Sequence, residues 1–423
     1  MSDQLTKLDT YEEFIPKLKK CMENIGDEVL PVAYTDIKHF KYFNDTYGYQ
    51  LGNDLLVRLA EMISEEREIF LCGARVVSDN IVSAGYLRGC DEKQILKFLR
   101  TSTEKIELEL RKEFNCNRIR LTTGVFFVTK YNCHLDPETI VSNANLARKQ
   151  AKERGVDEIV VFEEKMAKRI NKEVEILSSI EDALEKREIK AYYQPKIDSR
   201  NGKLIGAEAL VRWQKHNGEW MYPDEFIPVL EKSGQIVKVD YFMYEEVFAY
   251  VRRRIDQRKA VVPISMNVSR VHLRDLTIAN YVSSLFEKYR IPPEFVEFEI
   301  TENVFIENTE TVKSFVEAFH SMGVKVSMDD FGSGYSSLNL LSQIPIDVIK
   351  LDKCFLRSMC MSEKEKVVVS SIVNMTKALG MDSLCEGVES DEQSKFLKSI
   401  GCDIQQGYYF SKPVAEDAFD KLL

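Results

Sequence analysis

The sequence predicts an α/β protein of two domains, an N-terminal α/β domain followed by a (β/α)8 barrel. Its 423 residues exceed what one ordinary core supports, and 44% hydrophobic with 30% charged residues is typical of a globular protein. Apolar runs of strand length alternate with helical stretches along most of the chain. In the second half this alternation occurs eight times, the number that a (β/α)8 barrel requires.

The N-terminal part is predicted to contain a helical segment at 1–28 and a compact α/β domain at 29–163. Strands are predicted at the apolar runs 29–37, 70–77, 80–87, 118–128 and 158–162. Amphipathic helices are predicted around 53–63, around 95–114 and between the last two strands.

A helical connector is predicted at 164–174. The surrounding stretch 163–189 lacks Gly and Pro and keeps apolar residues at helical spacing, so it reads as one or two helices. A flexible linker would be rich in Gly and Ser. We therefore expect a stiff connection between the two domains.

The barrel is predicted to occupy 175–423. Its strands are predicted at 191–197, 206–213, 263–268, 296–301, 325–330, 348–352, 382–388 and 404–411. These runs are largely apolar throughout, as expected of strands buried on both faces.

Polar residues follow one another at the ends of the predicted barrel strands, where the active site of such a barrel lies. They are Glu208, Arg212, Asn267, Glu299, Glu302, Asp329, Asp330, Lys350, Asp352, Glu386, Glu389 and Gln406. Taken singly, Asn267 could be a turn or capping residue, Lys350 and Asp352 an ion pair, and Asp329–Asp330 a solvated loop. Their recurrence at equivalent strand ends favours one shared site.

So many carboxylates are unfavourable together unless a cation neutralises them. Oxygen ligands around hard divalent ions are suited to phosphoryl chemistry, and Arg212 could then pair with a substrate phosphate. The five histidines are scattered, which favours Mg²⁺ or Mn²⁺ over zinc. The residues alone therefore predict a metal-dependent phosphodiesterase or phosphatase.

Charge and hydropathy exclude several other classes. The net charge of −10 argues against binding to polymeric nucleic acid or to an anionic membrane. No apolar run reaches the ~20 residues that cross a bilayer, and the polar N-terminus is no secretory signal. With nine cysteines, an odd number without a CxxC pair, we expect buried free thiols and a cytoplasmic protein.

The second half also resembles a known family. The motifs YYQPKID, AEALVRW, NVS, EITE, DDFGSGYSSL, KLD, CEGVE and QGYYFSKP occur in this order and are similar to those of EAL-type cyclic di-GMP phosphodiesterases. The resemblance implies hydrolysis of cyclic di-GMP to linear pGpG, two metal ions per site and a homodimer. It also implies a barrel whose first strand runs antiparallel to the others.

Residue roles follow from that resemblance. The implied ligands of the metal ions are Glu208, Asn267, Glu299, Asp329 and Asp330. The implied catalytic residues are Glu386 and Lys350. The implied substrate contacts are Gln194, Arg212, Asp352, Glu389 and Gln406. Glu302 is implied to support the loop Phe331–Asn339.

The first half resembles a degenerate GGDEF diguanylate cyclase domain, with a mostly antiparallel sheet and flanking helices. TDIKHFKYFNDTYGYQLGNDLL matches the metal- and guanine-binding region of that family, but Val77–Ile81 stands where its Gly-Gly-Asp-Glu-Phe hairpin is expected. Bulky Val77 should obstruct a turn that approaches phosphates, and Asn80 lacks the charge of the catalytic Glu. Further departures are Tyr49, Asn53, Glu68 and Leu71. Cyclase activity is therefore not expected.

Two alternatives remain open at this point. The first domain either binds GTP weakly through Asp36, Asp79 and Asn44, or serves only dimerisation or signal relay. The barrel is either an enzyme or a receptor that binds cyclic di-GMP without cutting it. Because such receptors usually lose metal ligands and this chain keeps them, an enzyme is favoured.

Overall fold

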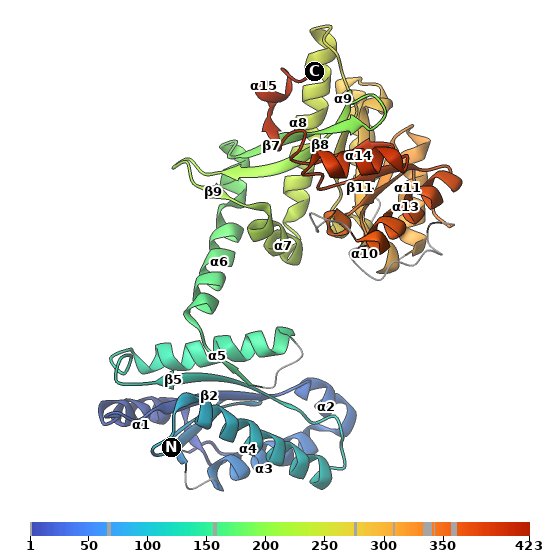
Figure 1. Cartoon of the computed structure of the whole chain (residues 1–423). Coiled ribbons are helices and arrows are strands. Elements are labelled where there is room, and N and C mark those ends of the chain that lie inside the picture. The colour runs from blue at the N-terminus through green and yellow to red at the C-terminus, as the bar shows by residue number, and fades with distance from the viewer. Residues whose placement is uncertain are drawn as a thin grey trace. The chain divides into compact units, whose positions relative to one another are not determined.

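The computed structural model describes residues 2–65, 69–154, 159–274, 277–307, 309–332, 341, 343–356 and 362–423. The chain divides into two compact units, Met1–Lys172 and Glu173–Leu423, each of which has its own layers of helices and strands (Figure 1). Among the described helices, none combines the length and the apolar character needed to cross a membrane.

The first unit is a six-stranded sheet with helices on both faces. Its elements are, in chain order, β1 (Asp9–Thr10), α1 (Tyr11–Glu23), β2 (Leu30–Ile37), α2 (Phe40–Tyr47), α3 (Tyr49–Glu65), β3 (Phe70–Val77), β4 (Asn80–Gly85), α4 (Glu92–Glu113), β5 (Leu121–Val128), α5 (Pro137–Arg154), β6 (Ile159–Val161) and the first part of α6 (Glu164–Glu185). The strand order is β1-β3-β4-β2-β5-β6. The three central pairings are antiparallel and the two outer ones parallel, which confirms the expected mostly antiparallel sheet.

Successive side chains along each strand point to opposite faces of the sheet, so this unit has a core on each face. Val32 and Tyr34 of β2 pack with Phe14 of α1 and Ala144 of α5. The intervening residue Ala33 packs on the other side with α4. One sheet face therefore carries α1 and α5, and the opposite face carries α3 and α4.

The sequence predicts a helical segment at 1–28 ahead of the first domain, and the structure packs this segment into that domain. β1 pairs in parallel with β3, and α1 buries Phe14, Leu18 and Met22 in the core of the sheet. The apolar stripe of α1 needs a partner surface, and the sheet supplies it. This segment is therefore an integral part of the first unit.

The second unit is a closed barrel wrapped by helices (Figure 1). Its elements are β7 (Ile189–Asp198), β8 (Leu204–Gln214), β9 (Trp220–Met221), α7 (Pro223–Ser233), α8 (Ile236–Asp256), β10 (Ile264–Asn267), η1 (Arg270–Arg274), α9 (Thr277–Tyr289), η2 (Pro293–Phe295), β11 (Val296–Thr301), α10 (Glu302–Glu307), α11 (Thr309–Ser321), β12 (Lys325–Phe331), β13 (Val348–Leu351), η3 (Lys353–Leu356), α13 (Glu363–Ala378), β14 (Asp382–Cys385), α14 (Asp391–Ser399), β15 (Ile404–Gln405), β16 (Val414–Ala415) and α15 (Glu416–Phe419).

Eight of these strands close the barrel in the order β7-β8-β10-β11-β12-β13-β14-β15 and back to β7. The barrel strands β8, β10, β11, β12, β13, β14 and β15 run parallel, whereas β7 is antiparallel to both of its barrel neighbours. The predicted barrel and the antiparallel first strand are both confirmed. Because the other seven strands are parallel, their carboxyl ends meet at one rim.

The predicted connector is the first part of one long helix. α6 runs without interruption from Glu164 to Glu185, well beyond the predicted end at residue 174. Ile176, Ile180 and Ala183 on its second half are fully buried in the core of the barrel unit. The apolar side chains whose spacing predicted this helix therefore also pack its second half against the barrel.

Candidate active site

The carboxyl ends of the barrel strands gather a cluster of buried acids around one lysine. Glu208 lies on β8, Glu299 on β11 and Asp329 on β12, and all three are buried. Lys350 lies on β13 with no exposed surface, and Glu386 directly follows β14. The pairing of neighbouring strands brings these residues together. Glu299 pairs with Asn267 of β10, and Lys350 pairs with Leu384 of β14, two residues before Glu386.

Lys350 is the centre of the cluster. Its Nζ lies 3.0 Å from Asp329 Oδ1, 2.7 Å from Glu386 Oε1 and 3.5 Å from Glu208 Oε2. It also forms a short ion pair with Glu299 Oε2. Burial opposes the charge on Lys350, but the surrounding carboxylates hold its pKa well above the ordinary value. One ammonium group therefore orients four carboxylates.

The carboxylate of Glu208 is fixed by three donors. Asn267 Nδ2 donates to Oε1 at 3.0 Å, and Gln406 Nε2 donates to Oε2 at 2.7 Å. Lys350 approaches the second oxygen as well. Gln406 also donates to Gln194 Oε1 at 3.2 Å, which ties β7 into the same network.

Negative charge in this cluster exceeds the positive charge that the protein supplies. Burial and the neighbouring carboxylates raise the pKa of Glu208, Asp329 and Asp330, and burial raises that of Glu386 to about 8. The pKa values of adjacent acids rise because each carboxylate opposes ionisation of the next. The cluster therefore favours binding of further positive charge.

The donor set fits hard divalent ions. Glu208, Glu299 and Asp329 each offer a carboxylate oxygen within 4.8 Å of the others, and so do Asp329, Asp330 and Glu386. Asp329 belongs to both groups and could bridge two ions. Five carboxylates with the amide of Asn267 nearby form the oxygen-rich environment that Mg²⁺ and Mn²⁺ prefer.

Lys196 and Glu297 form a second layer below the cluster, and sequence reasoning missed both. Lys196 Nζ lies 3.0 Å from Glu299 Oε1 and 3.2 Å from Glu297 Oε1, and Ser327 donates to the same Glu297 oxygen. Although burial alone would raise the pKa of Glu299, Lys196 and Lys350 lower it to about 2. The sequence could have indicated Glu297, because it lies two residues before Glu299 on the same strand and so faces the same side.

Arg212 and Asp352 lie at the edge of the cluster. Arg212 is half-buried, burial lowers its pKa, and its Nη1 donates only to the backbone oxygen of Val211 at 2.8 Å. No carboxylate among the described residues forms an ion pair with it, so it is free to bind an anion. Asp352 Oδ1 accepts a hydrogen bond from the backbone of Cys354, and its charge contributes to the raised pKa of Asp330.

Glu389 is not brought into the cluster. It is exposed in the segment after β14, where its backbone N–H donates to Gln393 Oε1 at 2.8 Å just before α14 begins. Its side chain makes no ion pair or hydrogen bond to any described site residue. A substrate role for Glu389 stays a prediction.

Glu302 holds the start of the loop that sequence reasoning assigned to it. Its Oε2 accepts a hydrogen bond from Gly332 N at 2.7 Å, and its buried Oε1 has no partner among the described residues. Asp330, the penultimate residue of β12, adopts a positive φ of 57°, and the pairing of β12 with β13 shifts register between Met328 and Phe331. The remainder of the predicted loop, residues 333–339, lies outside the described residues.

The predicted metal position of the first unit is occupied by the protein's own cations. Asp36 is 2% exposed, and its Oδ2 pairs closely with Arg148 Nη1 and lies 3.1 Å from Lys152 Nζ. Arg148 is fixed in turn by Asn145 Oδ1, at 2.9 Å from Nε and 2.8 Å from Nη2. The guanidinium group also lies 5.3 Å from the ring centre of Tyr34.

The other acid of that position is also engaged. Asp79 Oδ2 accepts a hydrogen bond from the backbone of Ile37 at 3.0 Å, and Ser78 makes the turn before it with a positive φ of 55°. Asn44 lies on α2, and its buried Oδ1 has no hydrogen-bond partner among the described residues. Arg148 and Lys152 already supply positive charge at Oδ2 of Asp36, so a divalent ion would compete with them there, although Oδ1 of Asp36 is buried with no partner among the described residues. Glu68 lies outside the described residues.

Loss of Arg148 is expected to loosen the first unit. In Arg148→Met, buried Asp36 keeps only half-exposed Lys152 as a partner, and breaking a buried pair in this way costs about 3 kcal/mol. Hydrogen exchange of β2 and α5 should become faster, while the double variant Arg148→Met/Asp36→Asn should recover most of the protection. Unchanged exchange in Arg148→Met would show that the pair contributes nothing.

A closed barrel with an antiparallel first strand and an acid cluster around a buried lysine defines a class of protein. Consistent with this class, the family model described as "EAL domain" matches residues 177–413, more than half of the chain. The chain belongs to the EAL domain family. A second model, "Diguanylate cyclase, GGDEF domain", matches residues 1–158, which confirms the resemblance of the first unit.

Two curated relatives match different shares of the chain. Cyclic di-GMP phosphodiesterase PdeR of Escherichia coli is 30% identical over 431 residues, which cover 99% of this chain and 63% of PdeR. Cyclic di-GMP phosphodiesterase RocR of Pseudomonas aeruginosa is 37% identical over 250 residues, 58% of this chain and 64% of RocR. The chain thus spans less than two thirds of these curated relatives.

A solved structure, the PaMucR phosphodiesterase in complex with c-di-GMP, has the same barrel. It is 30% identical, covers 58% of this chain and 99% of its own, and has a TM-score of 0.55.

Proposed function

We propose that the barrel hydrolyses cyclic di-GMP to linear pGpG with Mg²⁺ or Mn²⁺ bound at the acid cluster. The observation that carries this proposal is Lys350 held among Glu208, Glu299, Asp329 and Glu386, with Asp330 alongside. The names of PdeR and RocR support the substrate. A receptor that had lost catalysis would not need this complete set of acids.

Each residue has a task that its position supports. Glu208, Asn267, Glu299, Asp329 and Asp330 would hold the ions, which supply charge neutralisation and lower the pKa of the attacking water. Arg212, with no acidic partner among the described residues, would pair with a phosphate oxygen. Gln194 and Gln406, which already bond to each other, would position the substrate beside Glu208.

The proposed reaction breaks one phosphorus–oxygen bond. A water oxygen attacks the phosphorus while the carboxylate of Glu386, which lies 2.7 Å from Lys350 Nζ, accepts the proton. Lys350 holds Glu386 in place at 2.7 Å and stabilises negative charge that develops on the water. The bond to the 3′ oxygen breaks, that oxygen gains a proton, and a 5′ phosphate remains on linear pGpG.

Hydrolysis in water enriched in oxygen-18 tests this reaction. One labelled oxygen should appear in the 5′ phosphate of pGpG, as read by mass spectrometry of the purified product. Label in a free 3′ hydroxyl group would mean cleavage of the carbon–oxygen bond instead and would contradict the proposed attack on phosphorus. Bound but uncleaved cyclic di-GMP would favour the receptor alternative.

The first domain is proposed to lack cyclase activity. The internal pairing of Asp36 with Arg148 supports this proposal, because the acid that a metal-dependent cyclase needs is already neutralised. No cyclic di-GMP should form from GTP and Mg²⁺ in a Glu386→Gln variant, in which a product would no longer be degraded. Accumulation of cyclic di-GMP in that variant, measured by chromatography, would overturn the proposal.

The remaining expectations on partners stay predictions. They comprise a homodimer and weak binding of GTP at the first domain, and a cytoplasmic location likewise stays a prediction. The engaged state of Asp36 and Asp79 favours dimerisation or signal relay over metal-dependent GTP binding.

A further inference from the structure

The sheet of the first unit is built from small residues on one face. On that face Ala33 of β2 pairs with Ser83 of β4, and Thr35 of β2 pairs with Thr123 of β5. Gly85 follows Ser83 at the next position on the same face. The opposite face carries the larger side chains Val32, Tyr34, Val82 and Phe126.

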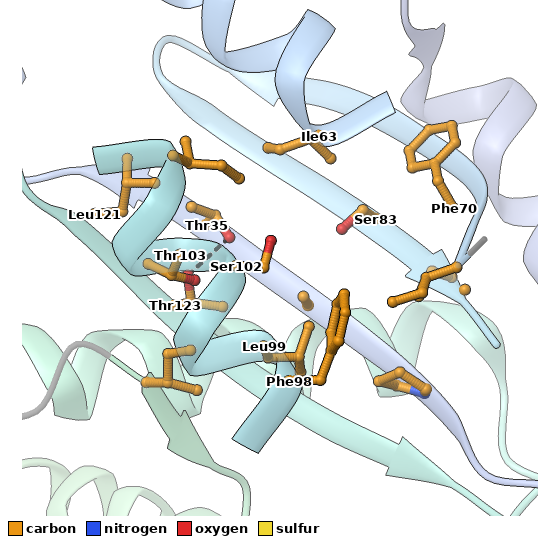
Figure 2. Close-up of a pocket in the computed structure, with 17 residues that line it drawn as sticks. Thr35, Ile63, Phe70, Ser83, Phe98, Leu99, Ser102, Thr103, Leu121 and Thr123 are labelled. Atoms are coloured by element: carbon orange, nitrogen blue, oxygen red, sulfur yellow. Dashed lines mark hydrogen bonds between the residues drawn. The ribbon is translucent and has the colours of Figure 1, made fainter. Parts of the chain in front are cut away.

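These small residues leave a hollow between the sheet and α4. Its volume is about 90 Å³, and Ser102, Thr103 and Phe98 of α4 form its opposite wall (Figure 2). Ile63 of α3 and Phe70 of β3 line the same space. Protein interiors are close-packed, with few voids larger than a water molecule, so a hollow of this size is a distinct feature of the domain.

Hydroxyl groups from both walls face this hollow. Thr35 and Thr123 hydrogen-bond to each other at 2.9 Å across the floor (Figure 2). The hydroxyls of Ser83 and Thr103 make no hydrogen bond to any described residue. A purely apolar packing defect would not need polar groups from two strands and a helix.

We propose that this hollow binds a small uncharged molecule with an apolar body and one hydroxyl or carbonyl oxygen. None of the side chains that line it carries a charge, so a charged ligand would lose its hydration without compensation. At about 10–15 Å³ per water-sized sphere, the volume of about 90 Å³ corresponds to a molecule of at most about six to nine non-hydrogen atoms. Ser83, Leu99 and Ser102 are only half-buried, which provides access from solvent.

The site is separate from the acid cluster and from Asp36. Asp36 and the residues before it alternate along β2, so Thr35 points toward α4 while the Asp36 carboxylate points toward Arg148 of α5. A ligand in the hollow therefore need not displace the ion pair. The first domain would act as a receptor for a neutral small molecule.

Methyl NMR of the full chain tests the proposal with 1-butanol as the probe. The methyl signals of Ile63, Leu99 and Ile106, which line the hollow, should shift and saturate with a dissociation constant on the order of 1 mM. Butyrate, the charged analogue of similar size, should bind at least tenfold more weakly. The methyl signal of Ile349, on barrel strand β13, serves as an internal reference.

Two filling variants on opposite walls provide the control. Ser83→Leu and Ser102→Leu should each weaken the binding of 1-butanol at least tenfold, whereas Ser371→Leu at an exposed position of α13 should leave it unchanged. If Ser83→Leu fails to fold, Ser102→Leu decides. The proposal would be overturned by methyl shifts that do not saturate, that persist in both the Ser83→Leu and Ser102→Leu variants, or that are equally large at Ile349.

Discussion

Replacement of Glu208 by alanine is expected to reduce the hydrolysis of cyclic di-GMP by at least about 10²- to 10³-fold. Glu208 is the carboxylate on which Asn267, Gln406 and Lys350 converge, at 3.0, 2.7 and 3.5 Å. Its removal takes away one member of the three-acid metal group and releases both amide donors. The loss should appear in kcat more than in the binding of cyclic di-GMP, since Arg212 remains.

A matched control separates this effect from a general loss of acidic charge. Glu392→Ala removes an exposed carboxylate from the first turn of α14, away from the cluster, and should keep the full rate. Initial rates of pGpG formation at saturating Mg²⁺ compare the two variants. A Glu208→Ala protein that turns over at the rate of Glu392→Ala would remove Glu208 from the catalytic site.

Replacement of Lys350 by methionine is expected to destabilise the barrel by about 3–5 kcal/mol in the absence of divalent ions. The methionine roughly keeps the length of the side chain but leaves three buried carboxylates and the partly buried Glu386 without their shared ammonium group. Added Mg²⁺ or Mn²⁺ should restore part of this stability, because ions then supply the missing positive charge. Hydrolysis should stay low even with the ions present.

Tryptophan fluorescence reports on this change without interference from the first unit. The two tryptophans of the chain are Trp213 and Trp220, and both lie in the barrel unit. The difference between the melting temperatures in EDTA and in Mg²⁺ measures how much the ion stabilises the barrel. The first-unit variant Arg148→Met should leave the tryptophan melting curve of the barrel unchanged. Equal stabilisation of Lys350→Met and the unmodified chain by Mg²⁺ would contradict the idea that Lys350 offsets the acid cluster.

The barrel was predictable from the sequence because its strands are short, apolar and regularly spaced. Burial on both faces makes each strand an uninterrupted apolar run, and a polar residue at the end of such a run is conspicuous. For this reason Glu208, Glu299, Asp329 and Lys350 could be assigned to one rim from the order of residues alone. The antiparallel direction of β7 came only from the resemblance, since periodicity is the same in either direction.

The interactions beneath and around the site were less predictable because they depend on pairing between distant residues. Lys196 and Glu299 are far apart in sequence but 3.0 Å apart at Nζ and Oε1, since β7 and β11 enclose the same interior. Arg148 reaches Asp36 from α5, and nothing in the local sequence around Asp36 reports that partner. The packing of α1 onto the sheet likewise depends on a surface formed elsewhere in the chain.

The account is tested most directly by hydrolysis of cyclic di-GMP by the purified chain, first stripped with EDTA and then supplied with Mg²⁺ or Mn²⁺, with products separated by chromatography. The account predicts no reaction in EDTA and steady formation of pGpG once either ion is added. Tight binding of cyclic di-GMP with no pGpG under any of these conditions would contradict it, because the acid cluster around Lys350 would then serve recognition and not cleavage.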